Sequence, residues 1–96
     1  AVFVNNFVNH LYRLAADYCA KENVPFDALK SLLLETAAKV QDLAPQQCQT
    51  GPAKRGDEST IQRHLKMLES FPQQLAVYEL LTKSIFVSEH LTGAKK

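Results

Sequence analysis

Three asparagines and a histidine crowd the beginning of the chain, within the segment VFVNNFVNHLY. Asn5 and Asn9 are four residues apart, and so are Asn6 and His10, so each pair shares one face if the segment is helical. An asparagine amide offers both donors and an acceptor, and a histidine ring exchanges a proton near neutral pH. We call these four residues the asparagine strip. Their types fit either a solvated helix face or a surface that hydrogen-bonds a polar ligand or a neighbouring chain.

A catalytic role for His10 as a general acid or base would need a carboxylate to orient its ring. Asp17 lies two helical turns away and Glu22 lies further still, so neither is within helical reach. A small complete enzyme built on His10 is therefore the weakest interpretation of the chain. Arg13 and Asp17, four residues apart, are most simply a surface ion pair that stabilises little.

A second concentration of chemistry lies in the loop CQTGPAKRGDES, residues 48–59. Gly51 and Gly56 allow backbone conformations that are closed to other residues. Thr50 can hydrogen-bond a backbone group or a ligand. The phosphate-binding pattern Gly-x-x-x-x-Gly-Lys-Ser/Thr is absent from the loop. These residues predict an ordered turn, and whether that turn touches a ligand stays open at this point.

Two charged residues sharpen the interpretation of this loop. The planar guanidinium of Arg55 suits a carboxylate or a phosphate. Asp57 could hold Arg55 in place, or it could cap the helix that follows. Free N–H groups at the start of that helix would favour an anion. Thr50, Gly51, Arg55 and Asp57 of the loop, and Asn6 of the first segment, are therefore candidates for binding a substrate or a cofactor, and a purely structural turn is the alternative.

Four helices are predicted to position these residues. The first covers residues 2–22, and Pro25 ends it because proline disfavours helical geometry at the preceding residue. The second runs from about Asp27, an N-cap or an early acidic position, to Leu43, and Pro45 closes it. Their apolar stripes are Phe3, Val4, Phe7, Val8, Leu11, Leu14, Ala15 and Tyr18 in the first helix, and Leu29, Leu32, Leu33, Thr36, Ala37, Val40 and Leu43 in the second.

The third and fourth helices follow the loop that extends from Ala44 to Gly56. The third covers residues 58–70, and Asp57 or Ser59 caps it. The fourth begins at Pro72, a first-turn position that suits proline, and fades near residue 91. No strand pattern appears, so the predicted class is all-α, with four main helices in a bundle. We expect one helical domain over residues 1–92 and a frayed tail over 93–96.

Composition excludes several classes of protein. The 96 residues carry a net charge of +1, which argues against nucleic-acid binding. Cys19 and Cys48 are too few for a disulfide framework, and with three scattered histidines they form no metal pattern. The apolar runs are too short to span a membrane, and no signal peptide is visible. We expect a cytoplasmic protein without a metal, and the start at Ala1 suggests the interior of a longer chain.

VFVNNFVNHLY and, some forty residues later, QTGPAKRGD together resemble a known family. They are similar to the C-terminal helical domain of a bacterial group of Rossmann-like oxidoreductases, a domain of unknown function that follows a nicotinamide-binding domain. The group is related to pyrroline-5-carboxylate and ketopantoate reductases and to 6-phosphogluconate and β-hydroxyacid dehydrogenases. The resemblance covers about residues 1–90. It is carried by Asn6, Phe7, Asn9 and Leu11 in the first segment, and by Gln49, Thr50, Gly51, Pro52, Ala53, Arg55, Gly56 and Asp57 in the loop.

This resemblance implies a function that composition does not show. The full protein would carry an N-terminal Rossmann domain that binds NADP or NAD, and this domain alone would bind neither cofactor. Without the Rossmann domain the chain would be inactive. The helical domain would form a homodimer through intertwined helices and provide one wall of a cleft that faces the nicotinamide.

One departure from the related enzymes concerns the catalytic residues. In β-hydroxyacid dehydrogenases and ketopantoate reductases, the first helix of this domain carries a Lys-x-x-x-Asn pair, and the lysine polarises the substrate oxygen. Here the analogous pair is Asn5 and Asn9, so Asn5, Asn6, Asn9 or His10 would have to substitute for the lysine. The rival interpretation is a stand-alone helical module that binds other proteins and has no enzymatic role.

Overall fold

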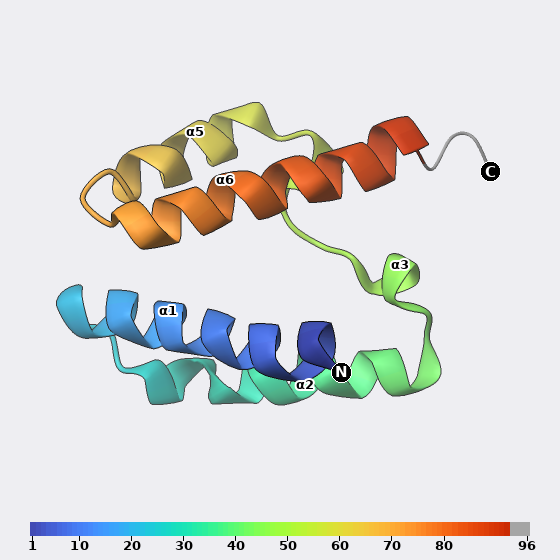
Figure 1. Cartoon of the computed structure of the whole chain (residues 1–96), viewed down its shortest axis with the longest axis horizontal. Helices are drawn as coiled ribbons and strands as arrows, with labels where there is room; N and C mark the ends of the chain where they lie inside the picture. The colour runs from blue at the N-terminus through green and yellow to red at the C-terminus, as the bar shows by residue number, and fades with distance from the viewer. Residues whose placement is uncertain (93–96) are drawn as a thin grey trace. The chain divides into compact units, whose positions relative to one another are not determined.

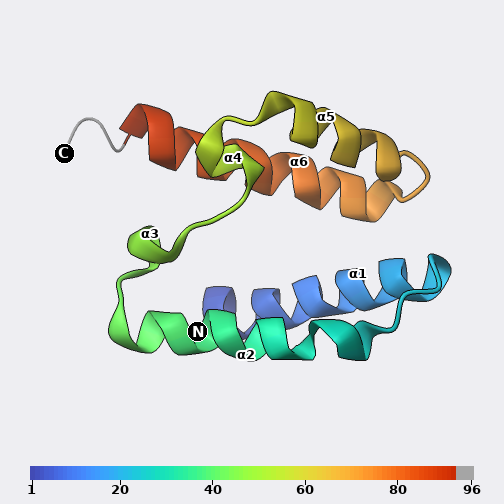
Figure 2. The ribbon, with the colours of Figure 1, turned by 180° about the vertical axis from the view of Figure 1, so that it is seen from behind.

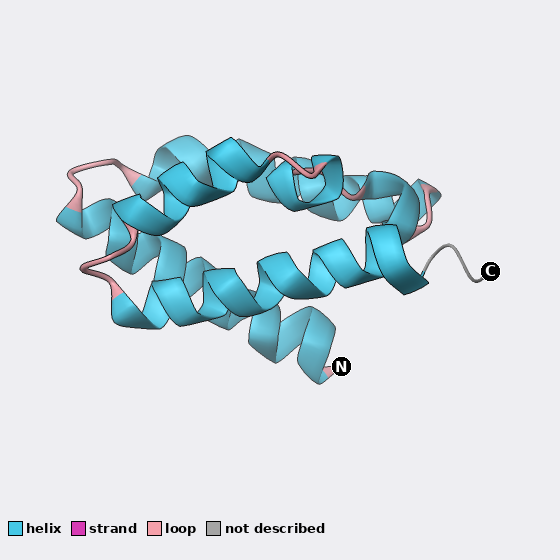
Figure 3. Ribbon diagram, turned by 90° about the horizontal axis from the view of Figure 1, so that it is seen from above, coloured by secondary structure: helices cyan, strands magenta, loops and turns pink. Residues whose placement is uncertain are grey.

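The computed structural model describes residues 1–92, and the expected tail at 93–96 lies outside this range. Every regular element in the described range is a helix (Figure 3). The prediction of an all-α chain is confirmed, and the four longest helices are α1 (Phe7–Lys21), α2 (Lys30–Asp42), α5 (Glu58–Met67) and α6 (Pro72–Phe86). The chain divides into two compact units, which we call the N-terminal unit (Ala1–Ala44) and the C-terminal unit (from Pro45).

The N-terminal unit is a pair of helices that follow one another along the chain. A π-helical turn, η1 (Val2–Asn6), leads directly into α1, so the segment predicted as one helix combines two geometries. The reversal after α1 uses Asn23 at φ +58°, a left-handed conformation that asparagine tolerates. Pro25 is extended, and a short 3₁₀ helix, η2 (Phe26–Leu29), then leads into α2. Asp27 lies in the first turn of η2 rather than at its N-cap.

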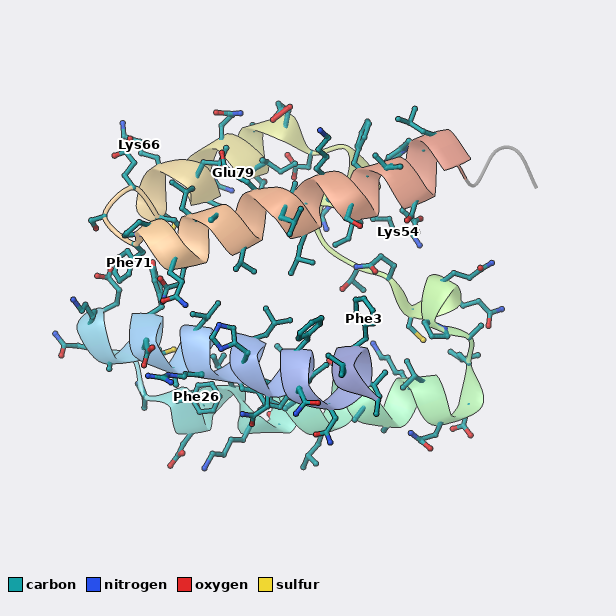
Figure 4. All side chains as sticks on the ribbon, viewed as in Figure 1. Phe3, Phe26, Lys54, Lys66, Phe71 and Glu79 are labelled. Atoms are coloured by element: carbon teal, nitrogen blue, oxygen red, sulfur yellow. The ribbon has the colours of Figure 1, made fainter. Side chains whose placement is uncertain are left out.

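The apolar stripe of the first helix is only partly covered. Leu14 is buried, at 5% exposed, whereas Phe3 and Val4 are 79% and 78% exposed. Phe3 meets Phe7 edge to face, with ring centroids 5.2 Å apart, and it projects from the side of η1 that faces away from α2 (Figure 4). The N-terminal unit therefore presents a cluster of large apolar side chains near its first residue.

The C-terminal unit begins with two single helical turns, α3 (Pro45–Cys48) and α4 (Pro52–Arg55). The expectation of an unbroken loop from Ala44 to Gly56 is therefore wrong. A four-residue helix is too short to show an apolar period, so the sequence gives no sign of it except proline at its start. Pro45 and Pro52 are the first residues of α3 and α4.

Helices α5 and α6 run antiparallel in the C-terminal unit, and α4 packs against both of them (Figures 1 and 2). Ala53 of α4 is 4% exposed and anchors this contact. His64 of α5 and Tyr78 of α6 are joined by a hydrogen bond of 2.8 Å between Nδ1 and the hydroxyl. A second π-helical segment, η3 (Val87–Thr92), continues α6 to the end of the described residues, close to the predicted limit at residue 91.

Candidate functional site

The most ordered candidate site is the stretch from Gly51 to Asp57, which we call the Arg55 turn. Helix α4 is its single helical turn, and glycines at positive φ lie on both sides of it, Gly51 at +102° and Gly56 at +68°. Such angles favour glycine because a Cβ atom is strained there. The N–H of Asp57 donates to the carbonyl of Pro52 at 2.9 Å and closes the turn. The backbone direction on either side of Arg55 is thereby fixed.

Asp57 is the centre of a hydrogen-bond network at the start of α5. Its Oδ1 accepts from the Thr60 N–H and the Ser59 hydroxyl, both at 3.2 Å, and its Oδ2 accepts from the Thr60 hydroxyl at 2.7 Å. Arg55 lies 3.4 Å from the same Oδ2. Asp57 therefore performs both structural roles that the sequence suggested, because it caps α5 and also pairs with Arg55.

These donors stabilise the ionised form of Asp57. The Thr60 hydroxyl is the largest cause, followed by the Thr60 N–H, and together with Ser59 and Arg55 they lower the pKa of Asp57 from 3.8 to about 2. Hydrogen bonds to a carboxylate favour its charged state. The Thr60 N–H is already satisfied by this carboxylate, so it is not available to an external anion. The cationic side chains of the turn, Lys54 and Arg55, are therefore the groups considered for binding an anion.

The two neighbouring cations of the turn have different surroundings. Lys54 Nζ lies 3.9 Å from Glu89 Oε1 in η3, and the lysine and glutamate side chains are 39% and 22% exposed. Figure 4 shows Lys54 beside this last segment of the chain. The Arg55 side chain is 59% exposed, and its 3.4 Å contact with Asp57 is longer than a strong charge-assisted bond. Arg55 is thus the cation better placed to receive an anion from outside.

Thr50 and Gly51 complete the predicted loop residues, and their contributions differ. Thr50 is exposed, and its carbonyl accepts a hydrogen bond from the Gln49 side chain at 3.0 Å. Gly51 precedes α4 and contributes through its backbone conformation. The structure thus brings Gly51, Arg55 and Asp57 together in one turn, with Thr50 at its entrance.

The asparagine strip lies in the other unit. Asn5 and Asn6 belong to η1, while Asn9 and His10 belong to the first turn of α1, and all four are exposed. Exposure leaves their amides and imidazole open to a ligand. It does not by itself distinguish a binding surface from a solvated helix face, so their role stays a prediction.

Three residues that contact the Arg55 turn were not predicted from the sequence. Thr60 supplies two of the donors to Asp57, and the spacing Asp-x-x-Thr at a helix start could have indicated it. His90 and Glu89, both in η3, contact the turn from more than thirty residues away. No local pattern could have indicated the last two, because only the packing of α4 near η3 brings them to the turn.

Two further searches concern metals and membranes. Within residues 1–92 no three histidine, cysteine, aspartate or glutamate side chains gather in a group that could hold a metal ion. In the same part of the chain, no helix combines the length and the apolar character needed to cross a lipid bilayer.

Comparisons with known proteins match this chain to a family model and to solved structures. Residues 1–85 match the family model described as "Domain of unknown function (DUF2520)". The solved structure titled "putative NADP oxidoreductase BF3122 from Bacteroides fragilis" is similar to this chain, with 51% sequence identity and a TM-score of 0.86. That match covers 90% of this chain and 34% of the other, so the chain spans about a third of the length of that protein. No curated protein matches. Because the family model covers most of the sequence, the chain belongs to the DUF2520 family.

Proposed function

We propose that this chain is the dimerisation and substrate-cleft domain of an NADP-dependent oxidoreductase, and that it is inactive without a dinucleotide-binding domain. The observation that carries the proposal is the 51% identity, over 90% of this chain, to a protein titled an NADP oxidoreductase. That protein is about three times as long as the matched part, which leaves room for a further domain. The bound nicotinamide would supply hydride transfer, and the helical domain would bind and orient the substrate.

The residues of this chain fit a supporting role toward the cofactor. The sequence has no Gly-x-Gly-x-x-Gly turn, so it lacks the backbone cradle that usually holds a dinucleotide pyrophosphate. What it offers is Arg55, an exposed guanidinium next to a carboxylate that binds it only loosely. A guanidinium of this kind can form two parallel hydrogen bonds to a phosphate or a carboxylate. In this proposal Arg55 binds an anionic group of the substrate or a phosphate of the cofactor.

The asparagine strip would form the polar part of the cleft wall. An amide can donate to a substrate oxygen and accept from a substrate hydroxyl, but it does not release a proton. Asn5 and Asn9 would therefore orient the substrate. In the described part of the chain the His10 ring has no hydrogen-bond partner and is exposed. His10 is accordingly the member of the strip that could transfer a proton.

Dimerisation is supported by the apolar side chains at the start of the N-terminal unit. Phe3, Val4 and Phe7 are at least half exposed, and fully burying an exposed side chain of this kind contributes about 1.5–3 kcal/mol, of which the half-exposed Phe7 would give about half. A second copy of the chain is the occupant that we propose for this surface. The same exposure would also suit the rival function, a stand-alone module that binds a different protein.

The proposal is tested on the full-length protein that carries this domain. NADP⁺ is titrated first, and inorganic phosphate is then titrated on the NADP⁺-saturated protein, for the wild type and for Arg55→Ala. Loss of NADP⁺ affinity would assign Arg55 to a cofactor phosphate, and loss of phosphate affinity alone would assign it to the substrate anion. Arg13→Ala is the matched control, because Arg13 is an exposed arginine in the other unit, 3.8 Å from Asp17.

Two results would contradict the proposal. If Arg55→Ala left both affinities unchanged and only lowered the melting temperature, the turn would be a structural brace. If the full-length protein bound no NADP⁺ and light scattering showed a monomer at all concentrations, the interaction-module interpretation would replace the oxidoreductase interpretation.

A further inference from the structure

The π-helical segment η3 contacts the Arg55 turn through a histidine. His90 Nε2 lies 3.0 Å from the carbonyl oxygen of Lys54 and 3.3 Å from that of Ala53. Carbonyl oxygens only accept hydrogen bonds, so Nε2 must carry a proton and donate it to both. These two carbonyls belong to α4, a one-turn helix whose last carbonyls have few partners inside the helix. The Ala53 carbonyl also accepts from the Gly56 N–H at 3.4 Å, so the Lys54 carbonyl is the one for which His90 matters most.

The last residue of α6, four positions before His90, packs against the imidazole. The ring of Phe86 lies beside it, with centroids 4.5 Å apart and planes inclined by 39°. Glu89, the preceding residue, reaches Lys54 at 3.9 Å. Glu89 thus contacts the side-chain charge of Lys54, and His90 contacts the backbone carbonyls of Lys54 and Ala53.

The contact matters because α4 is too short to hold its own conformation. A single helical turn is unfavourable in isolation, since the cost of ordering its residues exceeds the gain from one or two hydrogen bonds. The His90 bond fixes the carbonyl of Lys54, which belongs to the peptide group that joins Lys54 to Arg55. Holding that peptide plane adds to the bond from the Asp57 N–H in setting the direction in which the Arg55 side chain leaves the backbone.

The same contact separates the two neighbouring cations. Glu89 pairs with Lys54 and reduces its attraction for other anions. Arg55 is left with Asp57, whose oxygens are already occupied by donors from Ser59 and Thr60. Lys54 is thus paired within the C-terminal unit, and Arg55 is left open to a ligand.

We infer that His90 is a positioning residue for Arg55, acting with Glu89, and that η3 directs the Arg55 guanidinium toward the anionic group it binds. This inference rests on the proposed function of Arg55. His90 does not touch the ligand, so its influence on binding must pass through Arg55. That requirement separates a positioning role from a general contribution to stability.

The experiment is a double-mutant cycle on the full-length protein, with NADP⁺ and, on the NADP⁺-saturated protein, inorganic phosphate as probes. We expect Arg55→Ala to weaken binding of one probe about tenfold or more, because it removes a charge-assisted hydrogen bond. His90→Ala should weaken binding of the same probe about three- to tenfold. In the Arg55→Ala background, His90→Ala should change that affinity less than about twofold, because coupled residues are not additive.

Two further variants keep the test decisive if His90→Ala does not fold. His90→Gln retains an N–H donor at the end of a side chain of similar reach, and it should restore most of the affinity. His64→Ala removes a histidine hydrogen bond elsewhere in the same unit. It should lower the melting temperature without lowering the affinity.

The outcomes distinguish the inference from the proposed function. If Arg55→Ala binds both probes as the wild type does, the proposed role of Arg55 fails and the inference fails with it. If Arg55→Ala weakens binding but His90→Ala has no effect, or has the same effect in both backgrounds, the proposed function stands and the positioning role is overturned. Failure of His90→Gln to bind better than His90→Ala would also overturn it.

Discussion

The interactions inside the N-terminal unit differ in kind from those inside the C-terminal unit. In the N-terminal unit, the ion pairs Arg13–Asp17 and Lys39–Glu35 join residues four apart on one helix, and Lys30–Asp27 joins residues three apart where η2 meets α2. In the C-terminal unit, the bond between His64 and Tyr78 spans 14 residues, and the bond from His90 to Lys54 spans 36. Pairs within one helix stabilise that helix, whereas long-range bonds fix separate elements against each other.

This difference suggests a division of labour between the units. Apolar contact has no preferred direction, and the N-terminal unit leaves Phe3 and Val4 largely exposed. Hydrogen bonds have strict geometry, and they hold the C-terminal unit at the turn that carries Arg55. We therefore expect association with another chain to depend mostly on the N-terminal unit, and placement of a charged side chain to depend on the C-terminal unit.

The largest effect is expected from Phe3→Ala. This variant tests whether association with another chain depends on the N-terminal unit. Each dimer would lose two phenyl rings, at about 1.5–3 kcal/mol each, so its dissociation constant should rise about 100-fold or more. Light scattering over a dilution series measures this change. Met67→Ala is the control, because Met67 is 53% exposed but lies on α5. Equal weakening by both variants would show that the first residues of the chain are not the contact surface.

Tyr78→Phe tests the long-range bonds of the C-terminal unit. It removes the hydroxyl that bonds both His64 and Thr82, and a net loss of about 1 kcal/mol should lower the melting temperature by about 4–8 °C. Circular dichroism follows the transition. Lys39→Ala in the N-terminal unit serves as the comparison, because it should change the melting temperature least. A Tyr78→Phe protein that melts with the wild type would show that the bond adds nothing to the stability of the α5–α6 pair.

The same tyrosine predicts a dependence on alkaline pH. Burial raises the pKa of Tyr78 above 10.0, although a hydrogen bond with Thr82 opposes the shift. The folded state then keeps the proton in a range where the unfolded state loses it, so stability should be unaffected below about pH 10 and should fall above it. Melting temperatures of wild type and Tyr78→Phe, measured from pH 8 to 11, should converge as the pH rises. A constant difference between them would contradict this prediction.

Asp57→Asn should have a smaller effect at neutral pH, because asparagine also caps helices. Loss of the negative charge at the start of α5 should lower the melting temperature by about 2–4 °C. Since the pKa of Asp57 is lowered from 3.8 to about 2, its ionised form stabilises the fold fully above about pH 4. That contribution is lost as the pH falls through about 2. Melting from pH 7 to pH 2 measures the difference, and a difference that persists at pH 2 would have another origin.

Lys39→Ala should have the smallest effect, less than about 2 °C. Its Nζ lies 3.8 Å from Glu35, and the two side chains are about half or more exposed, so water and salt screen the pair. Differential scanning calorimetry in low salt and in 1 M salt measures it. A loss comparable to that of Tyr78→Phe would remove the contrast between the units.

The apolar spacing in the sequence was sufficient to predict the long helices. It was sufficient because apolar residues recur every three or four positions in each helix. This spacing matches one turn of an α-helix and places them on one face. Asp57 was also predictable as a cap, since its side chain bonds only to residues two or three positions away. Both cases depend on contacts that are local along the chain.

The remaining features depend on packing and on contacts between residues far apart along the chain, which no local sequence pattern predicts. Helix α4 is a single turn that packs against α5 and α6, as the burial of Ala53 shows. The contact between His90 and Lys54 of α4 depends on the path of the chain between them, since the two residues are 36 positions apart. The asparagine strip illustrates a further limit, because the same exposed amides fit a binding surface and a solvated face.

The two glycines of the Arg55 turn have a consequence for the substitutions that the turn tolerates. A Cβ atom at either position would meet no other atom within 4 Å, so any penalty there is torsional and not steric. Gly56, at φ +68° and ψ +30°, lies where asparagine is also found. Gly51, at φ +102° and ψ +169°, lies in a region that is essentially restricted to glycine. Across natural variants of this domain, position 56 should therefore alternate between glycine and asparagine, while position 51 should not vary at all.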